Sequence, residues 1–255
     1  MLMIWLIRHT ERLLFEDEKW QKSKRGLENK YDMPITNNGK KYLEKAVKEM
    51  IKNDTNFEKI DYIYSSAMSR CVETSIEIQK NIKKYTKKFI PIKIDYGLRE
   101  IHPIEYYNHL KYVNGKIEYK PDFKKEIVLD KKLHLNNLLK KYGDRIDKNY
   151  KSQTKFNEAK YRDKDWISGC NFALNSMKKI LKNDKNDNFI ICSHAVAIMN
   201  SLTAFTNKIT PFEIRKKIYG NQNWATLTGF NVNRKNKNPY KLVYGPTAKY
   251  WNSKL

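Results

Sequence analysis

The sequence predicts an α/β protein in which helices cover both faces of a mostly parallel central sheet, as a three-layer α/β/α sandwich. Apolar segments of strand length alternate with amphipathic segments of helical spacing, which is typical of consecutive βαβ units. Two of the apolar segments, residues 2–7 and 189–192, contain no charged or hydroxyl side chain. Such uninterrupted runs indicate parallel strands that are buried on both faces.

The first half of the chain contains three predicted strands, at residues 2–8, 60–64 and 89–94. A polar loop over residues 9–36 leads to a helix at about 37–52, where apolar side chains recur at helical spacing. Ser65 and Ser66 follow the second strand, and we expect them to cap a helix that runs to about residue 83.

The second half begins with residues 101–164, which are rich in Lys, Tyr and Asn and show one moderate helical pattern around 130–141. A connection of this length predicts an inserted cap or lid, within a single domain that spans residues 1–255. Beyond it we expect the following elements: a helix at 165–182, a strand at 189–193, a further helix, and edge strands at 224–232 and 241–244.

Composition narrows the class of protein. The chain of 255 residues has no apolar run near the roughly 18 residues that span a bilayer, so we expect no membrane association. Its first residues lack a basic leader and predict a strand in place of a signal peptide. The three cysteines are scattered and form no CxxC pair, which argues against a zinc site and favours a reducing, cytoplasmic location.

The formal net charge of +23 raises the question of a nucleic-acid partner. Only nine of the 51 basic residues are arginine, and the lysines are spread over most of the chain without forming a basic stripe. We therefore expect no nucleic-acid partner, and interpret the charge as a general attraction for anionic substrates and acidic partners.

Histidines follow the two uninterrupted strands. His9 stands between Arg8 and Arg12, and His194 follows the strand at 189–193. The carboxyl ends of the strands in an open α/β sheet form the edge where ligands bind. Planar guanidinium groups suit phosphate, and an imidazole at a strand end is a candidate nucleophile toward phosphorus. The pattern predicts a site that binds an anionic phosphate and attacks it.

Two further residues belong to the same predicted site. Arg70 lies at the second strand–helix junction and is expected to point into the same crevice. Glu100 follows the third strand and is the candidate proton donor to the leaving oxygen, with Glu105 as a competing candidate. Because several cations stand nearby, burial or a bound phosphate must raise the pKa of Glu100 for that role. His102, His109 and His134 are expected on the surface or in the lid, with a position lining the site as the alternative for His102.

The order of short motifs along the chain resembles that of the histidine phosphatase superfamily, also called phosphoglycerate mutase-like. The motifs are Arg8-His9-Thr10-Glu11-Arg12, Pro34-Ile35-Thr36, Tyr64-Ser65-Ser66 with Arg70-Cys71-Val72, Gly97-Leu98-Arg99-Glu100, and Ser193-His194-Ala195. Within the superfamily the chain is most similar to the phosphatase domain of the Sts/TULA proteins and to insect ecdysteroid-phosphate phosphatase. That similarity rests on Glu11-Arg12, on Arg70-Cys71-Val72 and on Tyr244-Gly245-Pro246-Thr247.

The resemblance implies a role for each candidate residue. It implies that His9 is the phosphorylated nucleophile, that Glu100 is the acid–base residue, and that no metal or organic cofactor takes part. It implies a phosphate pocket made by Arg8, Arg12, Arg70 and His194. Thr10 departs from the glycine usual after the nucleophile, where a residue without a side chain lets the backbone approach phosphate.

The predicted function is hydrolysis of phosphate monoesters through a phosphohistidine. The expected substrates are aryl (phosphotyrosine-type) or small alcohol or steroid phosphates, carried by a small molecule or a phosphoprotein. A phosphoglycerate-type mutase and a weakly active module that keeps the phosphate pocket are the alternatives. A homodimer is left open by the sequence.

Overall fold

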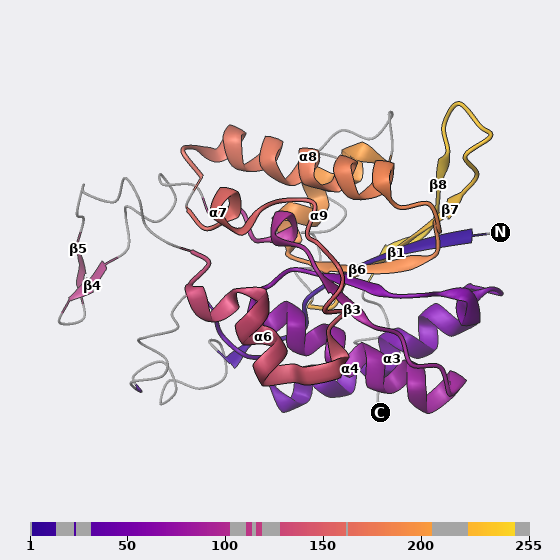
Figure 1. The fold of residues 1–255 in the computed structure, drawn as a ribbon, viewed down its shortest axis with the longest axis horizontal. Helices are drawn as coiled ribbons and strands as arrows, with labels where there is room; N and C mark the ends of the chain where they lie inside the picture. The colour runs from indigo at the N-terminus through magenta and orange to yellow at the C-terminus, as the bar shows by residue number, and fades with distance from the viewer. Residues whose placement is uncertain are drawn as a thin grey trace.

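The computed structural model describes residues 2–13, 23, 32–102, 111–113, 116–118, 128–161, 163–205 and 224–247. Its main sheet has the strand order β3-β2-β6-β1-β7-β8 (Figure 1). The strands are β1 (Leu2–Arg8), β2 (Ile63–Ser65), β3 (Ile92–Ile94), β6 (Phe189–Ser193), β7 (Leu227–Val232) and β8 (Tyr240–Thr247). Strands β3, β2, β6 and β1 are mutually parallel, whereas β7 is antiparallel to both of its neighbours. The predicted α/β class is confirmed.

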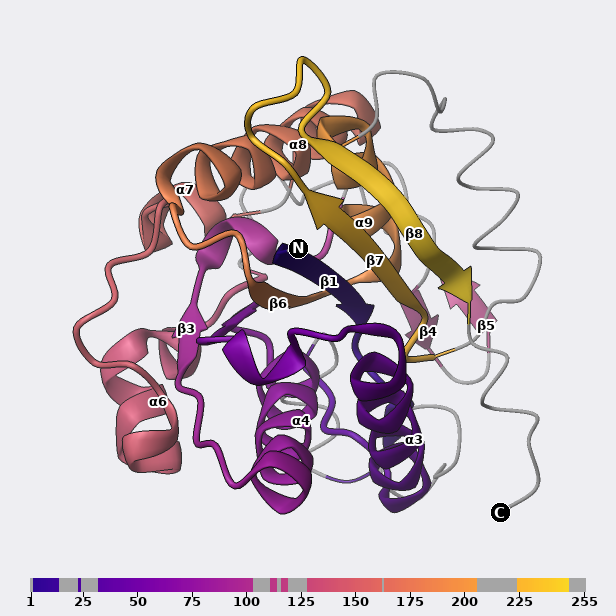
Figure 2. The same ribbon diagram turned by 90° about the vertical axis from the view of Figure 1, so that its right-hand side faces the viewer.

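Helices lie on both faces of this sheet, as Figure 2 shows. One face carries α3 (Asn37–Asn53) and α4 (Ser69–Thr86), and the other carries α8 (Trp166–Asn183) and α9 (Ala195–Ser201). The period-two geometry of β1 explains the division, because successive side chains point to opposite faces. Met3, Trp5 and Ile7 join the hydrophobic cluster under α3 and α4, while Ile4 and Leu6 join the cluster under α8 and α9. Both sides of β1 are therefore core.

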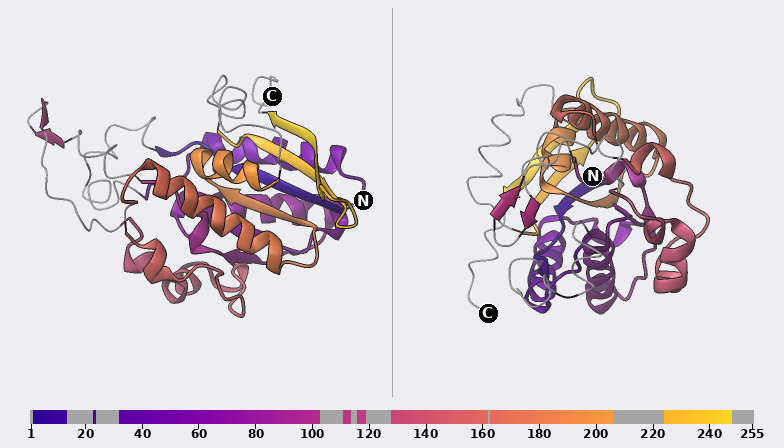
Figure 3. Two further views of the ribbon diagram at one scale, coloured as in Figure 1. Left: turned by 90° about the horizontal axis from the view of Figure 1, so that it is seen from above. Right: turned by 90° about the vertical axis from the view of Figure 1, so that its left-hand side faces the viewer.

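Shorter elements complete the described chain. They are η2 (Phe57–Lys59), η3 (Tyr96–Leu98), η4 (Lys131–Leu133), α6 (Leu135–Tyr142), η5 (Gly143–Arg145), α7 (Phe156–Ala159) and η6 (Leu202–Ala204). A separate two-stranded sheet pairs β4 (Lys111–Val113) with β5 (Lys116–Glu118) and lies apart from the main body (Figure 3).

The region expected to form a cap divides into two parts. Its second part contributes four side chains to the hydrophobic core under α3 and α4: Leu133, Leu138, Ile146 and Ala159. Most of its first part lies outside the described residues, and so does Glu105. The inserted cap stays a prediction.

Two local expectations are wrong. Strand β7 is internal, between β1 and β8, so of the two C-terminal strands only β8 is at an edge. Helix α4 begins at Ser69, after an N-cap at Met68 that makes no side-chain capping bond. The carboxylate of Asp32 supplies the acceptor instead, taking hydrogen bonds from the Ser69 N–H and hydroxyl, both at 2.6 Å. Because Asp32 lies 37 residues before Ser69, the sequence around the start of the helix does not reveal this cap.

The carboxyl ends of the parallel strands are aligned by their register. Arg8 pairs with Ser193 across β1 and β6, and Ser65 pairs with Cys192 across β2 and β6. The ladder extends one residue further, because the N–H of His9 donates to the carbonyl of Ser193 at 2.9 Å. His9 and the residue after Ser193 consequently leave the sheet side by side. None of the described helices combines the length and the apolar character needed to cross a bilayer.

Thr10 directs its side chain toward α3. Its hydroxyl donates to the carbonyl of Gly39 at 2.9 Å, and its N–H donates to the Thr74 hydroxyl at 3.1 Å. A Cβ added to Gly39 would lie 2.8 Å from Thr10 Cγ2 and 3.1 Å from the carbonyl oxygen of Glu11. Thr10 is not among the described residues with positive φ, so its position does not require glycine. The small residue at this contact is Gly39, on the opposing helix.

Replacing Gly39 with alanine tests this close approach. Alanine is the better helix former by about 1 kcal/mol, but overpacking against a fixed backbone costs about 1–3 kcal/mol. We expect Gly39→Ala to lower the free energy of unfolding, measured by denaturant titration. The exposed Lys41→Ala in the same helix should stay within about 0.5 kcal/mol of wild type. A Gly39→Ala protein that is more stable than wild type would show that Thr10 moves away from the new methyl group at little cost in free energy.

Candidate active site

His9 is held as a neutral imidazole with a defined tautomer. It is 1% exposed, and its Nδ1 lies 2.8 Å from the carbonyl oxygen of Thr10. Because a carbonyl only accepts, the proton is assigned to Nδ1, which leaves a lone pair on Nε2. The Nε–H of Arg70 donates toward that Nε2 at 3.3 Å. Burial first, then Arg70, Arg8 and Arg12, lower the pKa of His9 well below its usual 6.5.

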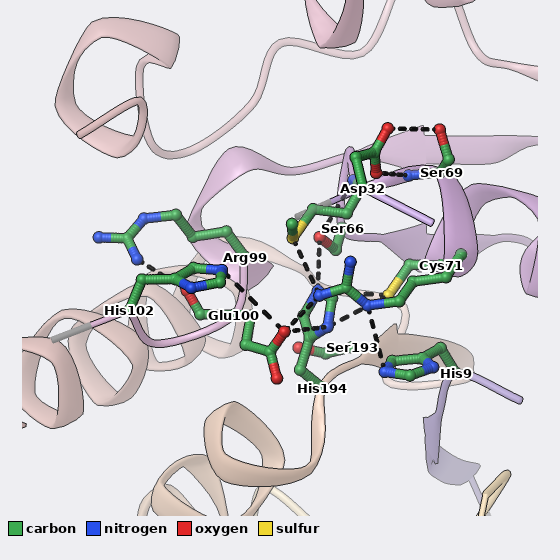
Figure 4. A network of polar contacts seen from close by, with 12 residues as sticks. His9, Asp32, Ser66, Ser69, Cys71, Arg99, Glu100, His102, Ser193 and His194 are labelled. Atoms are coloured by element: carbon green, nitrogen blue, oxygen red, sulfur yellow. Dashed lines mark hydrogen bonds and ion pairs between the residues drawn. The ribbon is translucent and has the colours of Figure 1, made fainter. Parts of the chain in front are cut away.

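His194 lies directly against His9, with ring centroids 5.2 Å apart (Figure 4). Its Nε2 is 3.0 Å from the Ser66 hydroxyl and 3.4 Å from Cys71 Sγ, so the residue after β2 and the first turn of α4 fix one edge of the ring. Its Nδ1 lies 3.8 Å from a carboxylate oxygen of Glu100. Burial and then the charge of Arg70 lower the pKa of His194 as well.

Arg70 connects the nucleophile candidate to the acid candidate. Its side chain is fully buried, and it donates from Nη2 to Glu100 while its Nε faces His9. Burial of Glu100 opposes ionisation, but Arg70, then His102, Arg12 and Arg8, outweigh it and lower the pKa of Glu100 to about 2. Glu100 is therefore a carboxylate in the free site at neutral pH.

Arg8 and Arg12 share one aromatic partner, Trp224. The guanidinium carbon of Arg8 is 4.2 Å from a Trp224 ring centroid, and that of Arg12 is 5.6 Å away. The same indole is 5.5 Å from the His9 ring, tilted by 37°. Trp224 thus forms one wall beside the nucleophile candidate and both flanking arginines.

The backbone that carries Glu100 is fixed by a buried ion pair. Arg99 bonds Asp163 through two nitrogens, at 2.9 and 2.5 Å, and also donates to the carbonyl of Glu100 at 2.7 Å. Asp163 accepts the His102 N–H at 2.8 Å as well. Contrary to expectation, His102 is buried, with Nε2 4.0 Å from Glu100, and burial lowers its pKa to about 4. The expectation that His134 is exposed holds.

Two carboxylates close in sequence to Arg12 and Arg70, those of Glu11 and Glu73, form hydrogen bonds with other residues. Glu11 accepts hydrogen bonds from Thr36 at 2.7 Å and from Asn38 at 3.2 Å. Glu73 accepts the N–H of Ile35 at 3.0 Å. The carboxylate that pairs with Arg70 is that of Glu100.

The charge of the site suits a phosphate dianion. Three guanidinium groups and one carboxylate give a net charge of +2, with both histidines neutral. These charges lie in a largely buried environment, where they interact more strongly than in water. In the part of the chain that the structure describes, no three His, Cys, Asp or Glu side chains are arranged to hold a metal ion.

The structure brings together the residues that the sequence singled out, which are Arg8, His9, Arg12, Arg70, Glu100 and His194. Trp224, the Arg99–Asp163 pair and the Asp32 cap were missed. Each acts across a long sequence separation, and no local pattern marks it. Glu105 and His109 lie outside the described residues.

Comparison with known protein families finds a match over the first half of the chain. Residues 4–125 match the sequence profile of the histidine phosphatase superfamily, branch 1. None of the curated proteins that were compared matches the chain.

Solved structures share the fold. The ecdysone phosphate phosphatase from Bombix mori, in complex with tungstate, is similar with a TM-score of 0.64 at 16% identity, over 96% of this chain and 93% of that chain. Mycobacterial hydrolase 1 has a TM-score of 0.51 at 10% identity, over 95% and 97% of the two chains. YhfR from Bacillus stearothermophilus has a TM-score of 0.50 at 17% identity, over 96% and 97%.

The lowered histidine pKa values predict acid lability. In the unfolded chain His9 titrates near 6.5, whereas in the folded protein its pKa is lower. Between those values the unfolded chain binds more protons, so this stability is complete above 6.5 and is lost as the pH falls. We expect His9→Asn to flatten the fall in unfolding free energy between pH 6.5 and pH 5, by up to about 1.4 kcal/mol per pH unit. Urea titrations at several pH values measure the slope, and an unchanged slope would mean that the pKa of His9 is the same in the folded and the unfolded protein.

Proposed function

From the match of residues 4–125 to the histidine phosphatase superfamily, branch 1, we propose that the chain is a member of this superfamily and hydrolyses phosphate monoesters through a phosphohistidine on His9. The observation that carries the proposal is the arrangement of His9, with Nδ1 bonded to the Thr10 carbonyl and Nε2 facing the Arg70 guanidinium. A neutral imidazole that carries a lone pair on Nε2, beside a cationic anion-binding group, is what nucleophilic attack on phosphorus requires.

In the first step, Nε2 of His9 forms a bond to phosphorus while the bond from phosphorus to the leaving oxygen breaks. We assign Arg8, Arg12, Arg70 and His194 to the oxygens of the transferred group, where preorganised donors neutralise the charge. A dianion beside His194 also favours its protonated form, because an opposite charge raises the pKa of a base.

Glu100 is the proposed proton donor to the leaving oxygen. In the free site Arg70 holds it ionised, with a pKa of about 2. A phosphate dianion neutralises Arg70 and adds a like charge beside the carboxylate, and both effects raise the pKa of Glu100. In the second step the Glu100 carboxylate takes a proton from water as that water attacks phosphorus, the bond to His9 breaks, and neutral His9 is regenerated.

The substrate is proposed as a chemical class of phosphate esters and not as an individual compound. The similar Bombix mori structure is named for a phosphate ester of a steroid and holds tungstate, an oxyanion. In this chain the indole of Trp224 borders the phosphate site, next to His9 and Arg8. We propose aryl phosphates and phosphates of small alcohols or steroids, borne by a small molecule or a phosphoprotein.

His9→Ala tests the nucleophile. Hydrolysis of p-nitrophenyl phosphate should fall to background, because the variant lacks the imidazole that is proposed to attack phosphorus. His134→Ala is the matched control, since His134 is exposed and packs against Tyr96 and Phe156 away from the arginines. Circular dichroism must show that both variants are folded. Substantial turnover by folded His9→Ala would refute the proposed mechanism.

Glu100→Gln tests the acid. An alkoxide must be protonated as it departs, whereas p-nitrophenolate leaves readily without a proton. General acid catalysis contributes roughly 10²–10⁴-fold, so we expect about that loss of kcat on an alkyl phosphate and a much smaller loss on p-nitrophenyl phosphate. Equal losses on both substrates would assign Glu100 a binding role. The differential pattern in Glu105→Gln would move the acid to Glu105.

A further inference from the structure

Trp224 occupies a position in the site that the chemistry above does not explain. It is half-buried. Its indole lies close to three residues of the site: Arg8 at 4.2 Å, His9 at 5.5 Å and Arg12 at 5.6 Å. Arg8 ends β1, whereas Arg12 lies on the loop that pairs with Ile35. A single ring therefore connects two arginines held by different parts of the backbone.

The backbone next to Trp224 is anchored to the residues that the ring contacts. The N–H of Ala225 donates to the carbonyl of His9 at 3.3 Å, and the N–H of Arg8 donates to the carbonyl of Thr226 at 3.1 Å. These two bonds extend the β1–β7 ladder beyond the pairing of Ile7 with Leu227. Trp224 is thus fixed to the end of β1, and the indole keeps its place relative to the nucleophile.

Ala225 has an uncommon conformation that redirects the chain at this point. Its φ is +56°, in the left-handed region that residues with a Cβ rarely adopt. Ala225 is fully buried, so the surrounding structure maintains this conformation. Backbone conformations of this kind cluster at functional sites, where they fix the direction of a neighbouring side chain.

The indole ring offsets two free-energy costs of binding an anion with two neighbouring guanidinium groups. Arg8 and Arg12 repel each other, and each long side chain loses rotamer freedom when it fixes an anion. The negative face of an indole attracts guanidinium groups and restricts their orientation. Arginines held in this way before an oxyanion arrives lose less entropy on binding it.

We propose that Trp224 is a positioning residue that holds Arg8 and Arg12 in place to receive the oxygens of a phosphoryl group. The inference rests on the proposed function in one respect, since it takes the site to be one that binds a phosphate-like oxyanion. It assigns Trp224 no contact with the reacting atoms. Trp224 affects substrate binding only by positioning Arg8 and Arg12.

Tungstate tests the inference without turnover, because it is an oxyanion with no leaving group. Calorimetry would give its Kd for wild type, Trp224→Ala and Trp224→Phe, with Trp166→Ala as the matched control on α8. We expect Trp224→Ala to weaken tungstate binding about tenfold, and Trp224→Phe to stay within about threefold because phenylalanine keeps an aromatic face. For p-nitrophenyl phosphate, Trp224→Ala should raise KM more than it lowers kcat. Trp166→Ala should bind tungstate like wild type.

A double-mutant cycle identifies the route of the effect. If Trp224 acts through the arginines, Trp224→Ala should cost much less in the Arg8→Ala background, about threefold or less, because one stacked guanidinium is already gone. Equal costs in the two backgrounds would overturn the proposal. Unchanged tungstate affinity in folded Trp224→Ala would also overturn it, and a loss confined to aryl substrates would instead make the ring a leaving-group wall.

The two proposals fail separately. Loss of tungstate affinity in Trp224→Ala, in a protein that hydrolyses no phosphate ester, would uphold the positioning role and reject the phosphatase. Normal tungstate affinity in Trp224→Ala, together with turnover that depends on His9, would reject the positioning role and uphold the phosphatase.

Discussion

The parallel pairing of β1 with β6 is the constraint on which the candidate site depends. Its register sets Arg8 opposite Ser193, and the hydrogen bond from the His9 N–H to the Ser193 carbonyl extends it to the first residue beyond the strand. A shift of one residue would turn the apolar side chains of β1 to the wrong faces and separate the two imidazoles. Because β1 is buried on both faces, the same packing that stabilises the sheet also keeps His9 against His194.

Arg70 then determines the charge state of the site. Burial, and then the charge of the Arg70 guanidinium, lower the pKa values of His9 and His194 and keep both neutral. The same guanidinium keeps Glu100 ionised. The free site therefore holds its nucleophile candidate in the reactive form and its acid candidate in the unreactive form. We propose that an incoming phosphate dianion reverses the second state, because it neutralises Arg70 and adds a like charge beside Glu100. Burial keeps the pKa of His9 low, and the Thr10 carbonyl keeps the proton of neutral His9 on Nδ1. Substrate binding and proton donation are coupled in this way.

The sequence was sufficient for the parts of the fold and site that have local signals. The apolar runs of β1 and β6, each followed by a histidine, are visible without any knowledge of pairing, and Arg70 lies in a short strand–helix junction. The position of Trp224 was not predictable, because it depends on how β7 pairs with β1, and the segment was expected at a sheet edge. Asp163 escaped notice for a similar reason, since its partner Arg99 is 64 residues away. The contact of Thr10 with Gly39 of α3 was also not predictable from the sequence, because it joins residues 29 positions apart.

The most direct test of the account is the site of phosphorylation within the imidazole. Because Nδ1 of His9 is bonded to the Thr10 carbonyl, only Nε2 is available to attack phosphorus. The enzyme would be mixed rapidly with a phosphate monoester and denatured in alkali, where a phosphoramidate survives. Mass spectrometry would locate the modified residue, and ³¹P NMR would distinguish the two ring nitrogens. The account predicts phosphate on Nε2 of His9. Phosphate on Nδ1 or on another residue, or hydrolysis without any phosphoenzyme, would contradict it.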